Sequence, residues 1–410
     1  MRRVVITGMG AVSPYGKGVD LFIDSLIAGK SAITSLSELA EIEGLRSWVA
    51  GLVNDIDPKE IPRKYRRSMS KMSIYATLAC REALNQAGLT AEHCASGHLG
   101  VAIGSTTGST QATQEFFDSF LSTRGLEQVK STVFFKIMNH SCAANVSQIL
   151  GITGRTLSPS AACSTSCQAV GYGYEMIAFG KQDFMLCGGA DEYHPLATGA
   201  FDILNAASIK FNDHPSRTPR PFDYERDGVV CSEGSGILLL ESLESAQKRG
   251  VNILCEIIGF ATVSDPSNIA NPDKASITRC MQLALKDANL EPSEIDYINA
   301  HATGTIQGDI AESEAIAEIF GSKTPVSSLK GHLGHTMAAS GALELAALVE
   351  MINRGCLIPS LNLENIDDAC SNIRHVRELE TASIKAAIKN NFALGGINSS
   401  LVIRRYKKDD

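Results

Sequence analysis

One pattern restricts the fold of this chain more than any other feature. Short apolar runs end in glycine or another small residue, and stretches of helical periodicity separate them. The runs lie at residues 4–6, 99–103, 184–186, 237–240, 253–258 and 295–298. Several are continuously apolar, as expected for strands buried on both faces of a sheet. The helical stretches lie at residues 72–87, 275–288 and 341–353. Strands that alternate with helices predict an α/β fold with largely parallel strand pairing.

The plan of one segment recurs later in the chain. Residues 99–107 contain an expected strand, a turn rich in Gly, Ser and Thr, and the start of a helical segment, and residues 295–305 follow the same plan. A chain of 410 residues is also too long for one small core. We therefore predict two related halves, over residues 1–250 and 251–410.

The composition excludes several classes of protein. With 44% hydrophobic and 20% charged residues it is typical of a soluble globular protein, and the net charge of −8 argues against a nucleic-acid partner. No apolar run reaches the roughly 18 residues of a membrane span, and residues 1–8 resemble a first strand more than a signal peptide. The 11 cysteines show neither CxxC nor Cys/His metal spacing, which predicts no metal site, no disulfide framework and a cytoplasmic location.

Cys163 lies in a segment that suits a nucleophile. It follows a run punctuated by Gly154 and Pro159, and it precedes a helical stretch that ends near Gly180. Unpaired backbone N–H groups and the helix dipole favour negative charge at such a position, and the thiolate is the reactive form of cysteine. A buried cysteine is more often a small apolar side chain, so position alone does not establish the role of Cys163.

Two histidine motifs follow far downstream. His301 follows an expected strand, and His335 lies in a glycine-containing loop before an expected helix. Strand ends that feed loops are where α/β proteins place reacting groups, and a cysteine with two histidines in such turns indicates nucleophilic catalysis. His332 has no second ligand at metal spacing, so we assign it a structural role.

Three motifs together resemble the active-site signature of the β-ketoacyl–acyl carrier protein synthases. They are Ala-Cys-Ser-Thr at 162–165, Asn-Ala-His-Ala-Thr-Gly-Thr at 299–305, and Lys330 with the Gly-His pair at 334–335. Residues 220–230 and 391–398 are similar to further segments of these enzymes, and the resemblance covers nearly the whole chain. The elongating synthases I and II are the most similar type, because the initiating synthases carry asparagine where His335 stands.

The resemblance implies a fold and a reaction. The fold is a thiolase-type five-layered α-β-α-β-α sandwich built from two duplicated halves, usually as a homodimer or as a heterodimer with a related subunit. The reaction is a decarboxylative Claisen condensation of a cysteine-bound acyl chain with malonyl-acyl carrier protein, which gives a 3-oxoacyl chain two carbons longer. The pathway would be fatty acid or polyene/polyketide-like biosynthesis. Substrates would be carried on the phosphopantetheine arm of the acyl carrier protein, and no other cofactor is implied.

The resemblance also implies roles for the residues that carry it. Cys163 would accept the acyl chain, and its backbone N–H group would form an oxyanion hole with that of Leu394. His301 and His335 would donate N–H groups to the enolate that decarboxylation produces.

Further residues match supporting positions of the family. Lys330 matches the active-site lysine and Glu312 the acidic residue that pairs with it, since a buried lysine needs a partner. Thr303 and Thr305 match the threonines that hold the pantetheine arm, and Phe392 matches an aromatic residue beside the nucleophile. The alternatives are a solvated helix face for Glu312 and plain core packing for Phe392.

Two departures from the family concern the choice of substrate. Leu394 replaces the phenylalanine that gates acyl entry, and Thr107 falls where the family places a residue at the floor of the acyl pocket, near the dimer interface. A polar, branched residue at that floor would shorten or reshape the chain that fits. These two positions suggest a specialised polyene or polyketide-like product.

The densest basic cluster matches the segment at which the family docks its acidic carrier protein. The cluster consists of Arg63, Lys64, Arg66, Arg67 and Lys71. An oppositely charged partner favours docking there, and a merely solvated surface is the alternative.

Two other functions remain open at this point. A coenzyme A thiolase would carry a second cysteine in its C-terminal glycine loop, but residues 391–398 contain none. A non-catalytic chain-length subunit would lack the nucleophile, whereas this chain keeps Cys163 with both histidines.

Overall fold

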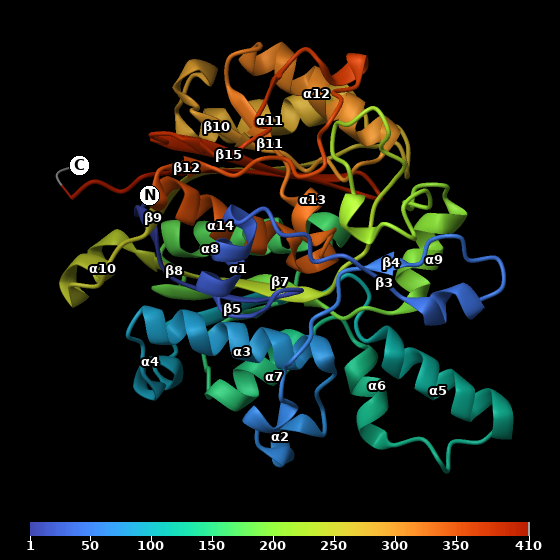
Figure 1. The fold of residues 1–410 in the computed structure, drawn as a ribbon. Coiled ribbons are helices and arrows are strands. Elements are labelled where there is room, and N and C mark those ends of the chain that lie inside the picture. Colours follow the sequence, from blue (N-terminus) through green and yellow to red (C-terminus); the bar gives the residue numbers. More distant parts are fainter. Residues whose placement is uncertain (409–410) are drawn as a thin grey trace.

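In the computed structural model, which describes residues 1–408, most strands join into one long twisted sheet (Figure 1). Its strands, in spatial order, are β13 (Arg374–His375), β11 (Pro325–Ser327), β10 (Tyr297–Asn299), β15 (Ala386–Ala393), β16 (Ile397–Arg404), β9 (Cys255–Ser264), β1 (Val4–Ser13), β8 (Gly234–Ser242), β7 (Phe184–Asp191), β5 (Leu99–Gly104) and β6 (Thr156–Leu157). Most of these strands are buried along their whole length, in agreement with the continuously apolar runs of the sequence.

The two parts of this sheet have the same strand order and direction. In the first part β1, β8 and β7 are antiparallel neighbours, and β7, β5 and β6 are parallel neighbours. In the second part β9, β16 and β15 are antiparallel, and β15, β10 and β11 are parallel. The parts join where residues 4–6 of β1 pair with β9. Strands β5 and β10, which carry the repeated sequence plan, occupy equivalent places.

Helices lie between the two parts of the sheet and on both outer faces (Figure 1). The inner helices are α8 (Thr165–Ala178) and α14 (Ser340–Arg354), and the outer ones include α3 (Lys71–Gln86), α7 (Ser141–Leu150), α11 (Lys274–Ala288) and α12 (Ile306–Phe320). Three large apolar clusters fill the spaces between these layers, one around α8 and α14, one under α3 and α7, and one under α11 and α12. Burial of these apolar faces is the main source of stability for such a fold.

The sequence predicted three of these helices to within about two residues, α3, α11 and α14. It did not predict strands β15 and β16. The reason is that Lys389, Asn390 and Asn391 interrupt the apolar run of β15, although all three are fully buried.

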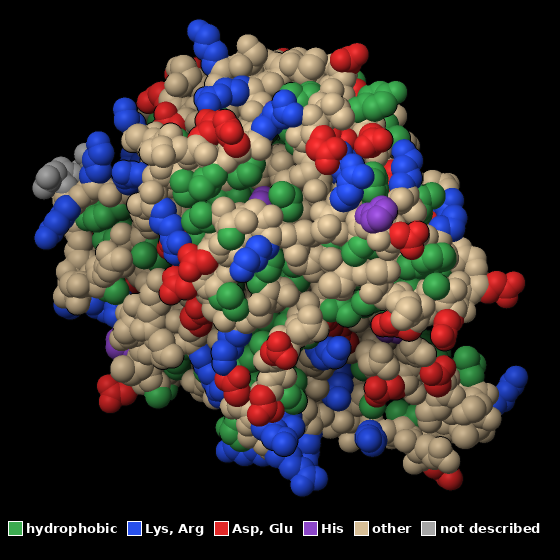
Figure 2. Space-filling model, in the orientation of Figure 1, with side chains coloured by type: hydrophobic (Ala, Val, Ile, Leu, Met, Phe, Trp, Pro, Cys, Tyr) green, Lys and Arg blue, Asp and Glu red, His purple; other side chains and the backbone are tan. Residues whose placement is uncertain are grey.

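The surface carries mixed charges, with one dense group of Lys and Arg side chains at the lower edge of Figure 2, where Figure 1 places α2 (Arg63–Arg66). A second feature is the hairpin of α5 (Thr110–Thr123) and α6 (Ser131–Ile137), which projects from the body in Figure 1 and exposes several large apolar side chains. Within residues 1–408, no helix combines the length and the apolar character needed to cross a membrane.

Candidate active site

Cys163 is presented by a strained turn directly before helix α8. The turn spans residues 162–164, and Ala162 has φ 44°, in the left-handed region that residues with a Cβ rarely adopt. The hydroxyl of Ser164 lies 2.9 Å from the Asn391 carbonyl oxygen and 2.7 Å from that of Ile397. Strands β15 and β16 of the second half therefore hold the turn that carries the nucleophile of the first.

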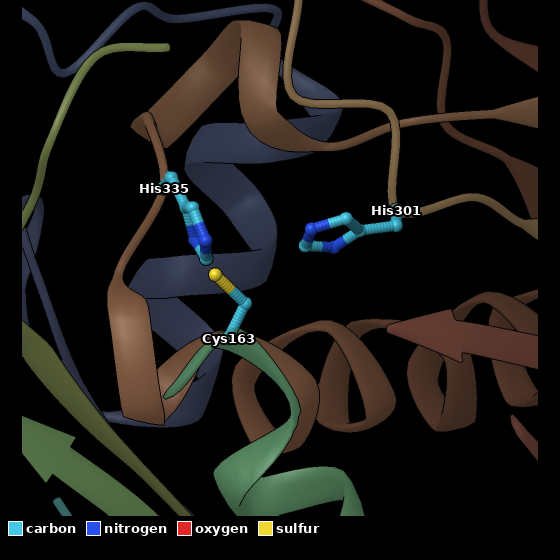
Figure 3. A group of neighbouring side chains, drawn as sticks. All are labelled: Cys163, His301 and His335. Carbon is cyan, nitrogen blue, oxygen red and sulfur yellow. The ribbon is translucent and has the colours of Figure 1, made fainter. Parts of the chain in front are cut away.

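Two histidines from the second half converge on the Cys163 sulfur (Figure 3). His301 follows β10, and His335 follows the short helix α13 (Lys330–Leu333). One ligand atom of each of the three residues lies within 4.8 Å of the others, and all three side chains are buried. That spacing is also within reach of a single metal ion, so the expectation of no metal site stays a prediction.

Hydrogen bonds fix the proton position on His335 and favour the same tautomer for His301. The backbone N–H of Met337 donates to Nδ1 of His335 at 3.2 Å, so the ring proton is on Nε2. That Nε2 is buried and has no hydrogen-bond partner among residues 1–408. Nδ1 of His301 lies 3.4 Å from the side-chain amide nitrogen of Asn391, which places the proton on Nε2 there as well. Two imidazole N–H donors are thus available in the site.

Both imidazoles are neutral at physiological pH. Burial lowers the pKa of His335 to about 3 and lowers the pKa of His301 well below its usual range, and the positive charge of Lys330 adds to both effects. Neutral rings suit donors that stabilise charge on a substrate oxygen, and they do not suit general acids at neutral pH.

The resting thiol is protonated, which corrects the expectation that the helix terminus alone favours a thiolate. Burial raises the pKa of Cys163 to about 11, against the opposing effects of the Leu394 N–H group and the charge of Lys330. The position before α8 agrees with the sequence prediction, but desolvation of the buried sulfur outweighs it.

The predicted ion pair between Lys330 and Glu312 is wrong. Lys330 Nζ donates to Glu344 Oε1 on α14 at 2.6 Å. The Glu312 carboxylate instead accepts the backbone N–H groups of His301 at 2.9 Å and Ala302 at 2.7 Å. Helix α12 places Glu312 under the turn after β10, where unpaired N–H groups face it, so Glu312 positions His301. An acidic residue inside the apolar stretch of residues 341–349 was the missed signal for Glu344.

The loop that follows β15 supplies the second backbone donor. Gly395 and Gly396, with φ 88° and 75°, turn the chain between β15 and β16. Gly395 N–H donates to the Ile269 carbonyl at 2.8 Å, which links this turn to the neighbouring loop. The N–H of Leu394 faces the Cys163 sulfur, while its side chain is 41% exposed at the cavity.

A cavity of about 330 Å³ opens above the cysteine. Its walls include Cys163, His301, His335, Thr303, Thr305, Phe392 and Leu394, all of which the sequence singled out. The hydroxyls of Thr303 and Thr305 lie 3.2 Å apart. Asn268, Asn271 and Gln307, which the sequence motifs did not indicate, also line it. A lining that includes hydroxyl and amide residues suits a ligand with several amide groups.

Thr107 and the basic cluster lie outside this cavity. Thr107 is exposed on the single chain, and its hydroxyl lies 3.2 Å from that of Thr110. None of the five cluster residues lines the cavity, and Arg66 donates to the Ile61 carbonyl at 2.8 Å. A floor formed by Thr107 is therefore not present within one chain.

The site thus offers two separate places for negative charge on oxygen. Backbone N–H groups of Cys163 and Leu394 face the sulfur, and the rings of His301 and His335 approach it as well (Figure 3). A buried thiol beside two such donor pairs defines a cysteine acyltransferase that can also stabilise an enolate.

Known proteins share this fold and sequence. Residues 1–246 match the family "Beta-ketoacyl synthase, N-terminal domain" and residues 254–364 match "Beta-ketoacyl synthase, C-terminal domain". The 3-oxoacyl-[acyl-carrier-protein] synthase 1 of Haemophilus influenzae is 36% identical over 99% of this chain and 100% of its own length. A β-ketoacyl synthase from Burkholderia phymatum STM815 superimposes with a TM-score of 0.96 at 42% identity, and the ishigamide ketosynthase/chain length factor with 0.91 at 30%, each covering 99% of this chain and 100% of the other.

This chain belongs to the β-ketoacyl synthase family, as its motifs predicted. It is accordingly an acyltransferase that forms carbon–carbon bonds.

Proposed function

We propose that this enzyme condenses an acyl chain held on Cys163 with a malonyl thioester, and that both substrates arrive on an acyl carrier protein. The single observation that carries the proposal is that two backbone N–H donors and two histidine rings all lie close to the Cys163 sulfur. The carrier is inferred from the name of the Haemophilus influenzae relative and from the amide-lined cavity.

The first step is thioester exchange. The Cys163 sulfur attacks the acyl carbonyl carbon, and the carbonyl oxygen becomes an oxyanion that accepts the N–H groups of Cys163 and Leu394. The bond from the acyl carbon to the pantetheine sulfur then breaks, and the thiol proton ends on that sulfur. Because the thiol pKa is high, the sulfur must lose its proton as it attacks, and the positive charge of Lys330 favours the anionic sulfur.

The second step is decarboxylation and carbon–carbon bond formation. The bond from the malonyl α-carbon to its carboxylate breaks, carbon dioxide leaves, and the electron pair passes to the thioester oxygen, which accepts the N–H groups of His301 and His335. The enolate carbon attacks the acyl-cysteine carbonyl, whose oxyanion uses the backbone donors. Collapse releases the cysteine thiolate, which takes a proton from water. Separate donor pairs for the two oxyanions explain why four groups surround one sulfur.

The remaining residue assignments follow the same chemistry. We assign Thr303 and Thr305 to the amides of the pantetheine arm and Phe392 to the wall beside the acyl-cysteine. The condensation involves no net oxidation or reduction, so it needs no cofactor beyond the carrier-bound arm.

We further infer a thiolase-type sandwich of two duplicated halves, residues 1–250 and 251–410, working as a dimer. The matching strand orders of the two sheet parts support the duplication. Phe117, Leu121 and Phe134 on the α5–α6 hairpin are 50%, 66% and 58% exposed, and large exposed apolar side chains gathered on one hairpin are typical of an interaction site. A partner on this hairpin would also cover Thr107. Sedimentation of Leu121→Asp tests this, with a monomer expected and an unchanged dimer contradicting it.

A non-catalytic chain-length subunit is the second candidate, favoured by the likeness to the ishigamide ketosynthase/chain length factor. Retention of Cys163, both histidines and the two backbone donors favours the catalytic function instead. A thiolase would need a second cysteine in the C-terminal glycine loop, and residues 391–398 hold none.

Intact mass spectrometry decides between these candidates. The chain is incubated with saturated and polyunsaturated acyl-carrier thioesters, with and without malonyl-carrier thioester. We expect an acyl adduct that is absent from Cys163→Ala and that disappears when the malonyl substrate is added. No adduct on the wild-type chain, with activity restored by an added partner subunit, would support the chain-length subunit. A plain preference for long saturated chains would contradict a polyene or polyketide-like product.

A further inference from the structure

A second lysine is buried behind the site. Lys389 lies on β15 and its side chain is fully buried, with Nζ 2.8 Å from Glu344 Oε2 and also donating to the Asn390 carbonyl. Lys330 Nζ lies 2.6 Å from the other oxygen of the same carboxylate. Two ammonium groups therefore share Glu344, one on each oxygen.

The register of β15 aims Lys389 at the catalytic layer. Successive strand residues face opposite sides, and Ile388 and Phe392 belong to the outer apolar cluster. Lys389 and Asn391 face the inner helices, and the Asn391 amide nitrogen lies 3.2 Å from the Cys163 carbonyl oxygen. Lys389 is thus two residues from a side chain that touches the nucleophile's own backbone.

Two buried cations and two buried carboxylates lie behind the histidines, and Lys389 is one of the cations. Lys330 and Lys389 are the cations, and Glu312 and Glu344 are the anions, each of the four nearly or fully buried. Asp191, the other carboxylate near Cys163, faces it from β7 and is satisfied by Ser105, Thr106 and Ala338. Other titratable groups near these four are Asp309, which forms an ion pair with Arg226, the phenol of Tyr297, and the thiols Cys163, Cys167, Cys231 and Cys280.

Without Lys389, one ammonium would face two buried carboxylates. The malonyl carboxylate and then the enolate must occupy the space in front of them, and a surplus buried anion opposes both. Acylation of Cys163 brings in no carboxylate, so it does not depend on this balance in the same way.

We propose that Lys389 is a positioning residue of the condensation step: it fixes Glu344 for Lys330 and supplies the counter-charge that lets the site accept an anionic extender. This proposal rests on the function proposed above. The pKa directions agree, because the two ammonium groups hold the pKa of Glu344 below its usual value even though burial raises it.

The test compares half-reactions in Lys389→Met and Lys389→Gln. Acyl transfer to Cys163 is expected to stay within about two-fold of wild type, and malonyl decarboxylation and condensation to fall about ten-fold, the factor that corresponds to roughly 1.4 kcal/mol. Lys389→Gln keeps a hydrogen-bond donor but no charge, so it should be equally impaired, while Lys389→Arg should recover most of the loss. Lys385→Met, which removes an exposed lysine just before β15, is the matched control and should not change either rate.

Three outcomes would overturn the proposal: an unchanged condensation rate in Lys389→Met, equal losses in both half-reactions, or full activity of Lys389→Gln. If Lys389→Met does not fold, a double-mutant cycle with Glu312→Gln replaces it. The double variant loses one buried positive and one buried negative charge, so it leaves no extra uncompensated charge. Against the Glu312→Gln background, loss of Lys389 should cost less than about three-fold, and a cost of ten-fold or more there contradicts charge balance. Absence of any Cys163 adduct in wild type would instead refute the proposed function itself.

Discussion

At the scale of single residues, the reactivity of Cys163 is set by the competition between burial and the donors around its sulfur. Because the thiol pKa is about 11, the thiolate fraction increases as pH rises toward that value. Alkylation of Cys163 by iodoacetamide should therefore rise about ten-fold per pH unit between pH 7 and pH 10, since only the thiolate reacts. Intact mass spectrometry measures the rate.

Two variants make this alkylation experiment specific. Cys163→Ser should remove the adduct formed in the cavity, because Cys163 is the cysteine that lines it, and any adduct that remains should lie on the partly exposed Cys356. Lys330→Met should lower the rate at any given pH, because the charge of Lys330 lowers the thiol pKa. A rate that levels off near pH 7 in the wild type would show that the thiolate already forms at neutral pH.

The backbone N–H of Leu394 faces the Cys163 sulfur, whereas its side chain is exposed at the cavity, so we expect the two parts of the residue to have separate roles. Leu394→Ala retains the N–H donor, so acyl transfer to Cys163 should stay within about three-fold, whereas removal of an oxyanion donor costs about 100-fold or more. Competition assays with carrier thioesters of different chain length should show a changed preference. A 100-fold loss of acyl transfer would mean that the side chain itself holds the donor in place.

Sequence motifs pointed to the three side chains that the structure brings together, but they did not predict the ion pairs behind them. Cys163, His301 and His335 each lie in a local turn that can be recognised in the sequence without the fold. The partner of Lys330 cannot be recognised in that way, because it depends on how α14 and β15 pack together. Lys389 was missed for the same reason, since a lysine inside a strand usually indicates an exposed edge.

At the scale of elements, the site depends on the close crossing of α8 and α14. A Cβ on Gly341 would lie 2.7 Å from the backbone nitrogen of Cys167 and 3.0 Å from the Asn391 side chain. Gly341→Ala should therefore push the two helices apart, lower the free energy of unfolding by about 1–3 kcal/mol and slow condensation. Urea unfolding and steady-state assays measure the two effects.

Gly199 provides the control for this substitution. It lies inside α9 (Pro195–Ile203), where a Cβ would meet its nearest neighbour, Leu45, at 4.0 Å. Gly199→Ala should leave activity unchanged and raise stability by about 0.5–1 kcal/mol, because alanine favours a helix. Equal stability of Gly341→Ala and wild type would show that the helices can separate without cost.

At the scale of the whole molecule, we expect the acidic carrier protein to dock at the basic cluster. Arg63, Lys64 and Arg67 are exposed on and beside α2, and their charge reversal should raise KM for carrier-bound substrates about ten-fold, with less effect at high salt. The same variant should use a free pantetheine thioester normally. Reversal of the exposed Lys181 and Lys385 is the charge-matched control, and equal loss with both kinds of substrate would contradict docking at α2.

The α/β class was predictable from the sequence, but the expected largely parallel pairing is wrong, because the longest strands pair antiparallel: β1 with β8, β8 with β7, β9 with β16 and β16 with β15. Within the sheet, residues 4–6 of β1 pair with residues 255–257 of β9, and this contact leaves no local trace in the sequence.

Division of the site between the two parts has a consequence for biosynthesis of the enzyme. The ribosome delivers Cys163 long before His301, His335 and Leu394, and the hydrogen bonds of Ser164 to Asn391 and Ile397 form only when β15 and β16 are present. We therefore expect a nascent or truncated chain to carry the thiol without the histidines and the Leu394 N–H, and to take up acyl groups poorly. We expect the site to become active only after the last two strands have folded, so completion of folding would limit when the enzyme can react.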